Sequence, residues 1–340
     1  MDFSFVASPN VNVSLVTKII RLDSFDQIAL LAESGGLSTW CDELRRGGVI
    51  SIGNFDGVHL GHVSLFNRVR ELAVAAKVSA IAVSFDPHPA TVLRPDLAPK
   101  RLMTMERRAE IMSYYGIDQL VICEVTESFL KLSAKEFFNT LVIDLLKAKA
   151  MVEGPNFFFG RDREGDQDLL ARFCEQHQIG LEITDSTEHS QQMISSSRIR
   201  SLLADGKVEE ASELLSHPYQ ICGTVISGDC RGREIGFPTA NLGNIEVLVP
   251  DSGVYGGIAT VRGKEFLAAI HVGSNPTFHQ ENQQKIEVHL IDFEEDIYGL
   301  DVRVDFLFRL RNVIRFTSIE ELVAQVEQDV QAVRNYAASK

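Results

Sequence analysis

The sequence predicts two folded domains: an α/β domain with a parallel sheet, followed by a small antiparallel β-barrel with a C-terminal helix. Its 340 residues, 45% of them hydrophobic and 24% charged, are typical of a globular chain of two ordinary domains. From Val49 onward, short apolar runs alternate with amphipathic stretches, which is the pattern of a parallel sheet covered on both faces. Beyond Pro218 the character changes to strands separated by glycine-rich turns, which favours antiparallel pairing.

The first half of the chain contains the alternating elements in order. Apolar runs predict strands at 49–52, 79–85, 119–125, 148–154 and 180–184. The amphipathic stretches between them predict helices at 61–77, 105–115, 134–146 and 165–178. In the first of these helices the apolar side chains share one stripe, as a helix packed on a sheet requires: Leu65, Phe66, Val69, Leu72, Ala73 and Ala76.

The second half begins with two short helical segments, at 196–205 and 208–215, and continues with strands. These strands are predicted at 220–227, 254–263, 266–273, 285–293 and 301–308. A closing helix starts near Ser318 and carries Leu322, Val326 and Val330 on one face. We therefore expect a flexible tail at 1–15, a first domain at 16–205, a linker at 206–217 and a second domain at 218–340.

The composition limits the partners. Lys plus Arg number 33 against 47 Asp plus Glu, and the net charge of −14 repels polyanions, so we expect no nucleic acid and no membrane as partner. A small nucleotide can still be held by backbone N–H groups and a metal ion. The five cysteines show neither CxxC spacing nor a zinc-like cluster. The first twenty residues lack the pattern of a signal peptide, so we expect a cytoplasmic protein, and a homo-oligomer is left open.

The segment GNFDGVHLGH, residues 53–62, carries the chemistry of the first domain. It lies between a predicted strand and a predicted helix, where unpaired helix N–H groups face a phosphate. Glycines allow close backbone approach, and His59 and His62 can donate to phosphoryl oxygens as charge builds during transfer. The alternative is a glycine-rich turn in which the histidines cap the helix.

This segment resembles the adenylyltransferase signature of bacterial FAD synthetases, which are related to the HxGH nucleotidyltransferases. SFDPHP at 84–89, VEGPNFFFGRDREGD at 152–166 and ISSSRIRSLL at 194–203 resemble further segments of that family. The family usually has a basic residue where Phe158 stands and a Thr where Ser197 stands. The resemblance implies a Rossmann-like nucleotidyltransferase fold and contacts to ATP or flavin from Gly53, Asp56, His59, His62, Asn156, Ser195, Ser196 and Arg200.

The segment GTVISGDCRGREIGFPTANL, residues 223–242, carries the chemistry of the second domain. Its glycines, Gly228 and Gly236 among them, mark a loop of the kind that folds over phosphates. Thr239 and Asn241 are oxygen ligands two positions apart, so on an extended segment they share a side and can bind one Mg²⁺ together with ATP phosphates. The alternative is an ordinary turn before a β-strand. No GxxxxGK[ST] motif is present.

GRxxGFPTANL, GVYGGIA, VGSNPTF and EVHLIDFEEDIYG follow in the order found in the riboflavin kinase module, which this half of the chain resembles. The resemblance implies that Glu287 is the general base that takes the proton from the 5′-hydroxyl of riboflavin. Glu287, His289 and Ile291 share one face of the strand, and Val288, Leu290 and Asp292 the other. The alternative is that Glu287 is simply an outward strand residue, because the sequence does not tell which face is the pocket.

Both resemblances together predict a bifunctional enzyme. It phosphorylates riboflavin to FMN with ATP, then adenylylates FMN to FAD with release of pyrophosphate, using Mg²⁺. One alternative is a chain that retains only one of the two activities. The other is a flavin- or nucleotide-binding regulator without turnover, against which the presence of His59, His62, Thr239, Asn241 and Glu287 counts.

Overall fold

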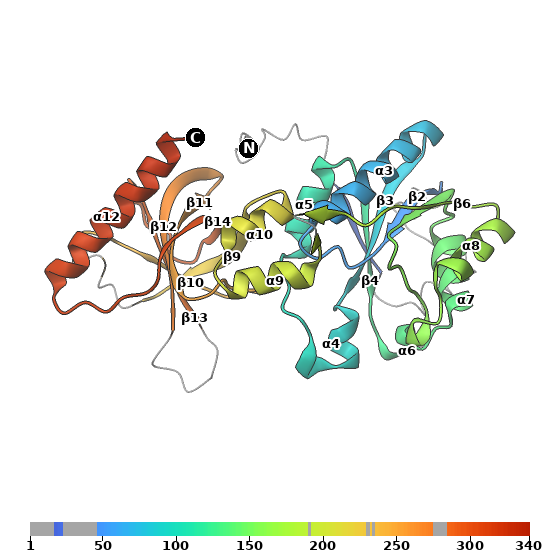
Figure 1. The fold of residues 1–340 in the computed structure, drawn as a ribbon, viewed down its shortest axis with the longest axis horizontal. Helices are drawn as coiled ribbons and strands as arrows, with labels where there is room; N and C mark the ends of the chain where they lie inside the picture. The colour runs from blue at the N-terminus through green and yellow to red at the C-terminus, as the bar shows by residue number, and fades with distance from the viewer. Residues whose placement is uncertain (1–16, 23–45, 190–191, 229–231, 233–234, 275–283) are drawn as a thin grey trace. The chain divides into compact units, whose positions relative to one another are not determined.

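The computed structural model describes residues 17–22, 46–189, 192–228, 232, 235–274 and 284–340. It contains two compact units. The sheet unit lies within Asn10–Lys100 and Met105–Ile194, and the barrel unit comprises Arg101–Thr104 and Ser195–Lys340. The tail predicted at 1–15 lies outside the described residues, and the predicted domain limits stay predictions. The predicted fold class is confirmed in both units (Figure 1).

The described part of the sheet unit contains one parallel sheet in the order β1-β4-β3-β2-β5-β6. Its strands are β1 Lys18–Leu22, β2 Gly48–Ile52, β3 Ser79–Asp86, β4 Gln119–Glu124, β5 Ala150–Glu153 and β6 Gly180–Ile183. Five of them lie where apolar runs predict strands. The edge strand β1 was not predicted, because only its pairing with β4, about 100 residues further along the chain, distinguishes this short segment.

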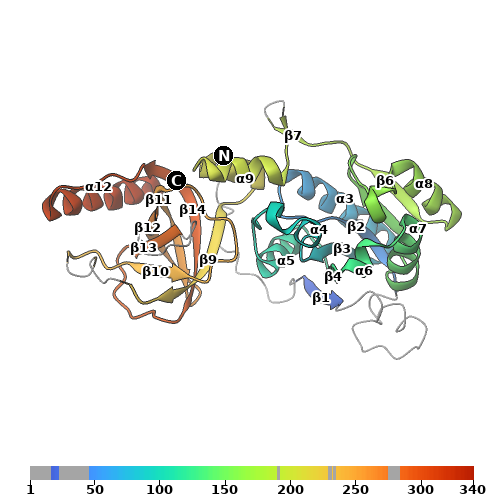
Figure 2. The same ribbon diagram turned by 90° about the horizontal axis from the view of Figure 1, so that it is seen from below.

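Helices cover both faces of this sheet, and Figures 1 and 2 show α3 and α5 on one side and α7 and α8 on the other. The helices are α3 Leu60–Ala76, α4 Pro89–Leu93, α5 Met105–Tyr114, α6 Glu127–Leu130, α7 Ala134–Phe137 and α8 Gln167–Gln176. The helix predicted at 134–146 begins as α7 and continues as a wider π-helical segment, Phe138–Leu145. Periodicity alone does not distinguish these two helix types over so few residues.

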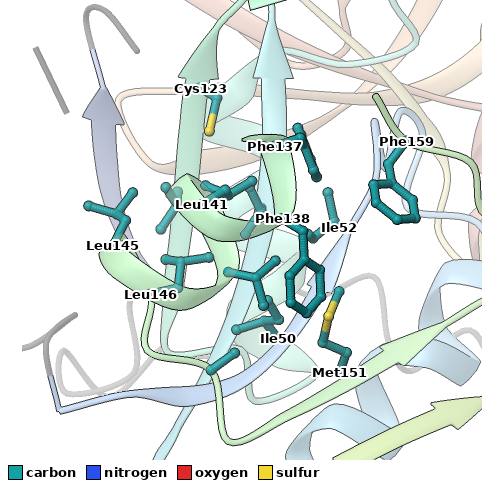
Figure 3. Close-up of a cluster of buried hydrophobic side chains, with 14 of the residues drawn as sticks. Ile50, Ile52, Cys123, Phe137, Phe138, Leu141, Leu145, Leu146, Met151 and Phe159 are labelled. Carbon is teal, nitrogen blue, oxygen red and sulfur yellow. The ribbon is translucent and has the colours of Figure 1, made fainter. Parts of the chain in front are cut away.

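A hydrophobic core lies under α7 and this π-helical segment (Figure 3). Phe137, Phe138 and Leu141 pack on the alternate side chains of the strands that face them, which include Ile50, Ile52, Cys123 and Met151. Every second residue of a strand shares a face, so the intervening residues face α3 and α5 instead. This core fixes one face of the sheet against α7 and the π-helical segment. The edge of the sheet at which the strands end remains available for the loops that follow them.

The barrel unit contains six antiparallel strands that close in the order β10-β13-β12-β11-β14-β9. They are β9 Tyr219–Ile226, β10 Ala240–Gly243, β11 Gly253–Val261, β12 Lys264–Ser274, β13 Gln284–Leu290 and β14 Asp301–Arg311. Helices α9 Ser196–Ala204 and α10 Val208–Leu215 precede the barrel. Much of the interval predicted as a linker is therefore α10, which packs on β9 and β14.

The closing helix is α12, Ile319–Ala338, which packs on β11 and β12. Leu322, Val326 and Val330 are half-buried on its inner face, as predicted. Asp329 on the same helix is buried and accepts from the Arg311 guanidinium at 2.7 Å. A buried carboxylate requires such a partner, so this pair ties the end of β14 to α12.

Replacing Gly257 of β11 with Ala is expected to destabilise the barrel unit by about 1–3 kcal/mol, because overpacking a closed core costs about this much. A methyl group at this position would overlap with the Asp305 carbonyl oxygen of β14. Calorimetric unfolding measures the change. Gly154→Ala is the control, since no atom lies within 4 Å of its added methyl group. Equal effects of the two substitutions would contradict the packing argument.

Candidate active sites

The carboxyl ends of β2 and β5 form the first candidate site. Strands β3 and β4 lie on one side of β2 and strands β5 and β6 on the other, so the chain order reverses between β2 and β5. Ligands of open α/β sheets bind at such a reversal. The backbone pairing of the two strands ends at Ile50 and Met151. Beyond it the Ile52 N–H donates to Glu153 Oε1 at 3.0 Å, so a side chain spans the place where the strands part.

The loop after β2 is held in an uncommon backbone conformation. Phe55 and Val58 have φ angles of 47° and 40°, in the left-handed region. Such conformations cost residues other than glycine roughly 1–3 kcal/mol each and gather at functional sites. Gly53 has no room for a side chain, because its Cβ would lie 2.9 Å from the Phe55 ring. The surrounding contacts must therefore stabilise this loop.

His59 and His62 lie at the start of α3 with stacked rings, whose centroids are 3.6 Å apart. His59 is the N-cap residue but makes no side-chain capping hydrogen bond, so the alternative that it caps the helix is wrong. Both Nδ1 atoms are buried without a hydrogen-bond partner among the described residues. Burial lowers the pKa of His59 to about 4. Burial, and then the charges of His59 and Arg108, hold the pKa of His62 well below its usual value, so both imidazoles are neutral at pH 7.

Asp56, a predicted nucleotide contact, is buried against Arg108 of α5, a residue that the sequence motifs do not mark. Arg108 is 3% exposed, and its Nη2 donates to Asp56 Oδ1 at 3.2 Å. Its Nη1 donates to the Asn54 carbonyl oxygen at 2.7 Å and to Ser84 Oγ at 2.9 Å. The sequence does contain a signal for Arg108, because helical spacing places this arginine on the same buried stripe of α5 as Met105, Ala109 and Met112. A charged residue is rarely buried without a partner, so its place on that stripe indicates a buried ion pair.

The other predicted residues of this site lie on two further segments. Asn156 is exposed in the segment after β5, at the same edge of the sheet as the loop after β2, and its Nδ2 lies 4.0 Å from Met193 Sδ. The rest lie in and just before α9, in the barrel unit: Ser195, Ser196 and Arg200. Ser195 is the N-cap residue, and its hydroxyl accepts from the backbone N–H of Arg198. The structure thus groups Gly53, Asp56, His59 and His62.

Strand pairing brings together the predicted residues of the second site. Asn241 on β10 pairs directly with Glu287 on β13, and Thr239 precedes Asn241 by two residues. Directly opposed residues of a ladder present their side chains on one face. Ile286 and Val288 are 1% and 0% exposed in the barrel interior, so Glu287 lies on the outer face. The structure thus gives the face on which Glu287 lies, and its role as general base stays a prediction.

Asn241 is poorly satisfied where it lies. Its side chain is 9% exposed, and its Oδ1 is buried without a hydrogen-bond partner among the described residues. Gly228 makes room for this amide, because a Cβ there would overlap with it. Gly236 has a φ of 86°, which favours glycine, and turns the chain before Thr239. An amide oxygen that lacks a donor is available to a cation.

Glu287 is held by two basic side chains that the sequence motifs do not mark. His271 Nδ1 on β12 lies 3.1 Å from Glu287 Oε2, and Lys285 Nζ lies 3.0 Å from Oε1. The hydrogen bond to His271, and then the hydrogen bond and charge of Lys285, lower the pKa of Glu287 to about 2 against the effect of burial. His289, two residues further on, has Nδ1 2.8 Å from the Pro238 carbonyl oxygen. The sequence could have placed Lys285 and His289 on the same face as Glu287, because alternate residues of a strand share a face. The contact of His271 with Glu287 could not be predicted, because it depends on the register between β12 and β13.

Comparisons with known proteins place both halves of the chain in described families. Residues 41–198 match the family model of FAD synthetase, and residues 215–337 match that of riboflavin kinase. Proteins described as bifunctional riboflavin kinase/FMN adenylyltransferase are similar to most of the chain. That of Listeria monocytogenes is 35% identical over 85% of this chain and 92% of its own length. That of Bacillus subtilis is 36% identical over the same shares.

The chain belongs to the bifunctional riboflavin kinase/FMN adenylyltransferase family. As a bifunctional riboflavin kinase and FMN adenylyltransferase, it acts in FAD biosynthesis, and the function predicted from its motifs is confirmed. Family membership implies flavins and ATP as small-molecule substrates.

A solved structure also resembles this riboflavin kinase/FMN adenylyltransferase. It comes from Streptococcus pneumoniae and is described as a macrolide-efflux protein, with a TM-score of 0.80 and 29% identity over 93% of this chain and 99% of that one. The likeness to that solved structure supports the fold of both units.

None of the helices in the described parts of the chain has the length and hydrophobicity needed to cross a bilayer.

Replacing Glu153 with Gln is expected to stabilise the sheet unit increasingly as the pH rises. Burial raises the pKa of Glu153 well above its usual value, so the folded protein keeps a proton that the unfolded chain loses above about pH 4. Wild-type stability then falls relative to the variant, by up to about 1.4 kcal/mol per pH unit. The amide retains the oxygen that accepts from Ile52.

Denaturant unfolding of both proteins between pH 4 and pH 8 measures this difference. The exposed Glu175→Gln substitution is the control. Cys174 does not interfere between pH 4 and pH 8, since burial is the main reason that the pKa of its thiol is raised to about 11. A difference between wild type and Glu153→Gln that does not change with pH would show that Glu153 is ionised in the folded protein.

Proposed function

We propose that FMN is adenylylated at the loop after β2, and that riboflavin is phosphorylated on the outer face of the barrel around Asn241 and Glu287. The observation that carries the first assignment is the stacked pair of His59 and His62 at the start of α3. The second rests on the direct pairing of Asn241 with Glu287. Ser195, Ser196, Arg200 and Asn156 stay predicted nucleotide contacts, and the homo-oligomer and cytoplasmic location stay predictions.

For adenylyl transfer the enzyme must bring the FMN phosphate to the α-phosphorus of ATP and offset the charge that grows as pyrophosphate leaves. Backbone N–H groups at the start of α3 and neutral imidazoles supply hydrogen-bond donors for this purpose. A neutral imidazole carries one N–H, so each histidine can donate to one phosphoryl oxygen. Burial keeps water from competing for these donors. No covalent protein intermediate is needed.

For phosphoryl transfer we propose that Thr239 and Asn241 hold Mg²⁺. The buried Oδ1 of Asn241, which has no hydrogen-bond partner among the described residues, fits this ion, because Mg²⁺ prefers hard oxygen ligands. With only one or two protein ligands, Mg²⁺ has further coordination positions for the oxygens of substrate phosphates. Mg²⁺ bound there would offset the negative charge on the transferred phosphoryl group. The loop that contains Gly228 and Gly236 is the proposed contact to the ATP phosphates.

Glu287 is proposed to receive the proton of the riboflavin 5′-hydroxyl. With a pKa of about 2 it is ionised at pH 7, and it is a weak base. In a loose phosphoryl-transfer transition state the hydroxyl needs orientation more than early proton removal. The carboxylate, fixed by His271 and Lys285, supplies a rigid acceptor for that orientation.

Glu287→Gln is expected to lower the rate of riboflavin phosphorylation about 10²–10⁴-fold, the usual contribution of a positioned proton acceptor. FMN adenylylation by the same preparation is expected to stay within about twofold of wild type, because that chemistry is assigned to the other unit. Initial rates with riboflavin and with FMN measure the two activities. Full kinase activity in this variant would remove Glu287 from the assigned role.

His59→Ala and His62→Ala are each expected to lower FMN adenylylation about 10²–10³-fold, the usual effect of removing one donor to a developing charge. Riboflavin phosphorylation serves as the internal control and is expected to persist. The same rate assays measure both. Unchanged adenylylation in both variants would place the transfer elsewhere, and loss of both activities together would indicate misfolding rather than a catalytic role.

A further inference from the structure

The loop after β2 needs an external support, and Arg108 contacts it on both sides of its first strained residue. Arg108 Nη1 donates to the carbonyl oxygen of Asn54, and Nη2 donates to the side chain of Asp56. Phe55, with a φ of 47°, lies between these two residues. Ser84 Oγ adds a second donor to the Asn54 carbonyl at 3.1 Å. The Asn54 backbone and the Asp56 side chain, one on each side of Phe55, are thus tied to α5, and Asn54 is also tied to the end of β3.

The Phe55 backbone in turn determines where the histidines lie. The Phe55 ring meets the His62 ring edge-on, with centroids 5.3 Å apart, and meets Phe66 of α3 in the same manner at 5.0 Å. His62 stacks on His59. A shift of the loop at Phe55 therefore moves both imidazoles. A displacement of about 1 Å at reacting groups can lower a rate about 100-fold.

Arg108 also acts on the charge state of this pair. Among the residues that the structure describes, the groups whose charge acts on His62 are the stacked His59 and the Arg108 guanidinium, and Arg108 is itself paired with Asp56. The positive charge of Arg108 opposes protonation of His62 in a buried environment, where charges are weakly screened. The same side chain thus fixes the loop and disfavours a proton on His62.

We propose that Arg108 is a positioning residue for adenylyl transfer, which holds the loop after β2 in its strained conformation and so sets where His59 and His62 lie. This role rests on the proposed function of His59 and His62. A purely structural ion pair is the competing explanation, because a buried guanidinium needs a carboxylate wherever it lies. The two explanations differ in what happens to kcat and to its pH dependence when the protein stays folded.

Three variants of the full chain test this proposal. Arg108→Met keeps most of the side-chain volume but removes the charge and all donors, and Arg108→Lys keeps the charge but loses the two-pronged contact. Arg107→Met is the matched control, since its neighbour Arg107 pairs with Glu110 on the surface of α5. Riboflavin phosphorylation by each preparation reports on the barrel unit, and denaturant unfolding of each variant reports whether the sheet unit, which contains Arg108, is folded.

Arg108→Met is expected to lower kcat for FMN adenylylation about 100-fold with little change in KM. The ratio of its kcat to that of wild type is expected to fall further as the pH falls, because the pKa of His62 rises when the arginine charge is removed, while burial still holds it below its usual value. Taking the ratio cancels the titration of the substrate phosphates. Arg108→Lys is expected to lower kcat with a ratio that does not vary with pH.

Two results would overturn the proposal. One is an Arg108→Met enzyme with the wild-type kcat and pH profile. The other is a loss of adenylylation that matches the fraction of sheet unit unfolded in the assay, which is what a structural role alone produces. If His59→Ala and His62→Ala both adenylylate FMN at the wild-type rate, the proposed function of the two histidines is wrong. That outcome is seen in the histidine variants and does not depend on the Arg108 variants.

Discussion

Backbone hydrogen bonds between neighbouring strands fix where the functional side chains lie in both units. In the sheet unit the pairing of β2 with β5 ends at Ile50 and Met151, and the loop with His59 and His62 begins where the strands part. In the barrel the ladder β10-β13-β12 places Asn241, Glu287 and His271 in one row. A shift of one residue in this register would turn the row into the barrel interior.

The two groups of residues differ in the electrical state that their surroundings impose. Burial keeps His59 and His62 neutral, so the loop after β2 offers donors without adding a charged base. On the barrel surface, hydrogen bonds from basic neighbours keep Glu287 ionised, so that site offers an anionic acceptor. Adenylyl transfer needs donors for growing negative charge, whereas phosphorylation of a hydroxyl needs an acceptor for its proton. Each environment suits the reaction assigned to it.

Local patterns in the sequence were enough for the architecture and for the motifs, but not for the partners of the motif residues. Periodicity predicts α3 and most strands, because each is long or clearly alternating. It misses β1 and the contact of His271 with Glu287, since both depend on pairing between distant segments. The position of Arg108 on the apolar stripe of α5 is visible in the sequence, but its contacts are missed for a related reason, because Asn54 and Asp56 lie far from it along the chain.

The central claim is that one chain performs two separable reactions in sequence. Chromatography of the flavins formed by the purified chain with ATP, Mg²⁺ and either riboflavin or FMN tests it most directly. The account predicts that riboflavin gives FMN, which rises and then falls as FAD appears after a lag, and that added FMN gives FAD without a lag. Formation of only one product, or flavin binding without turnover, would contradict it.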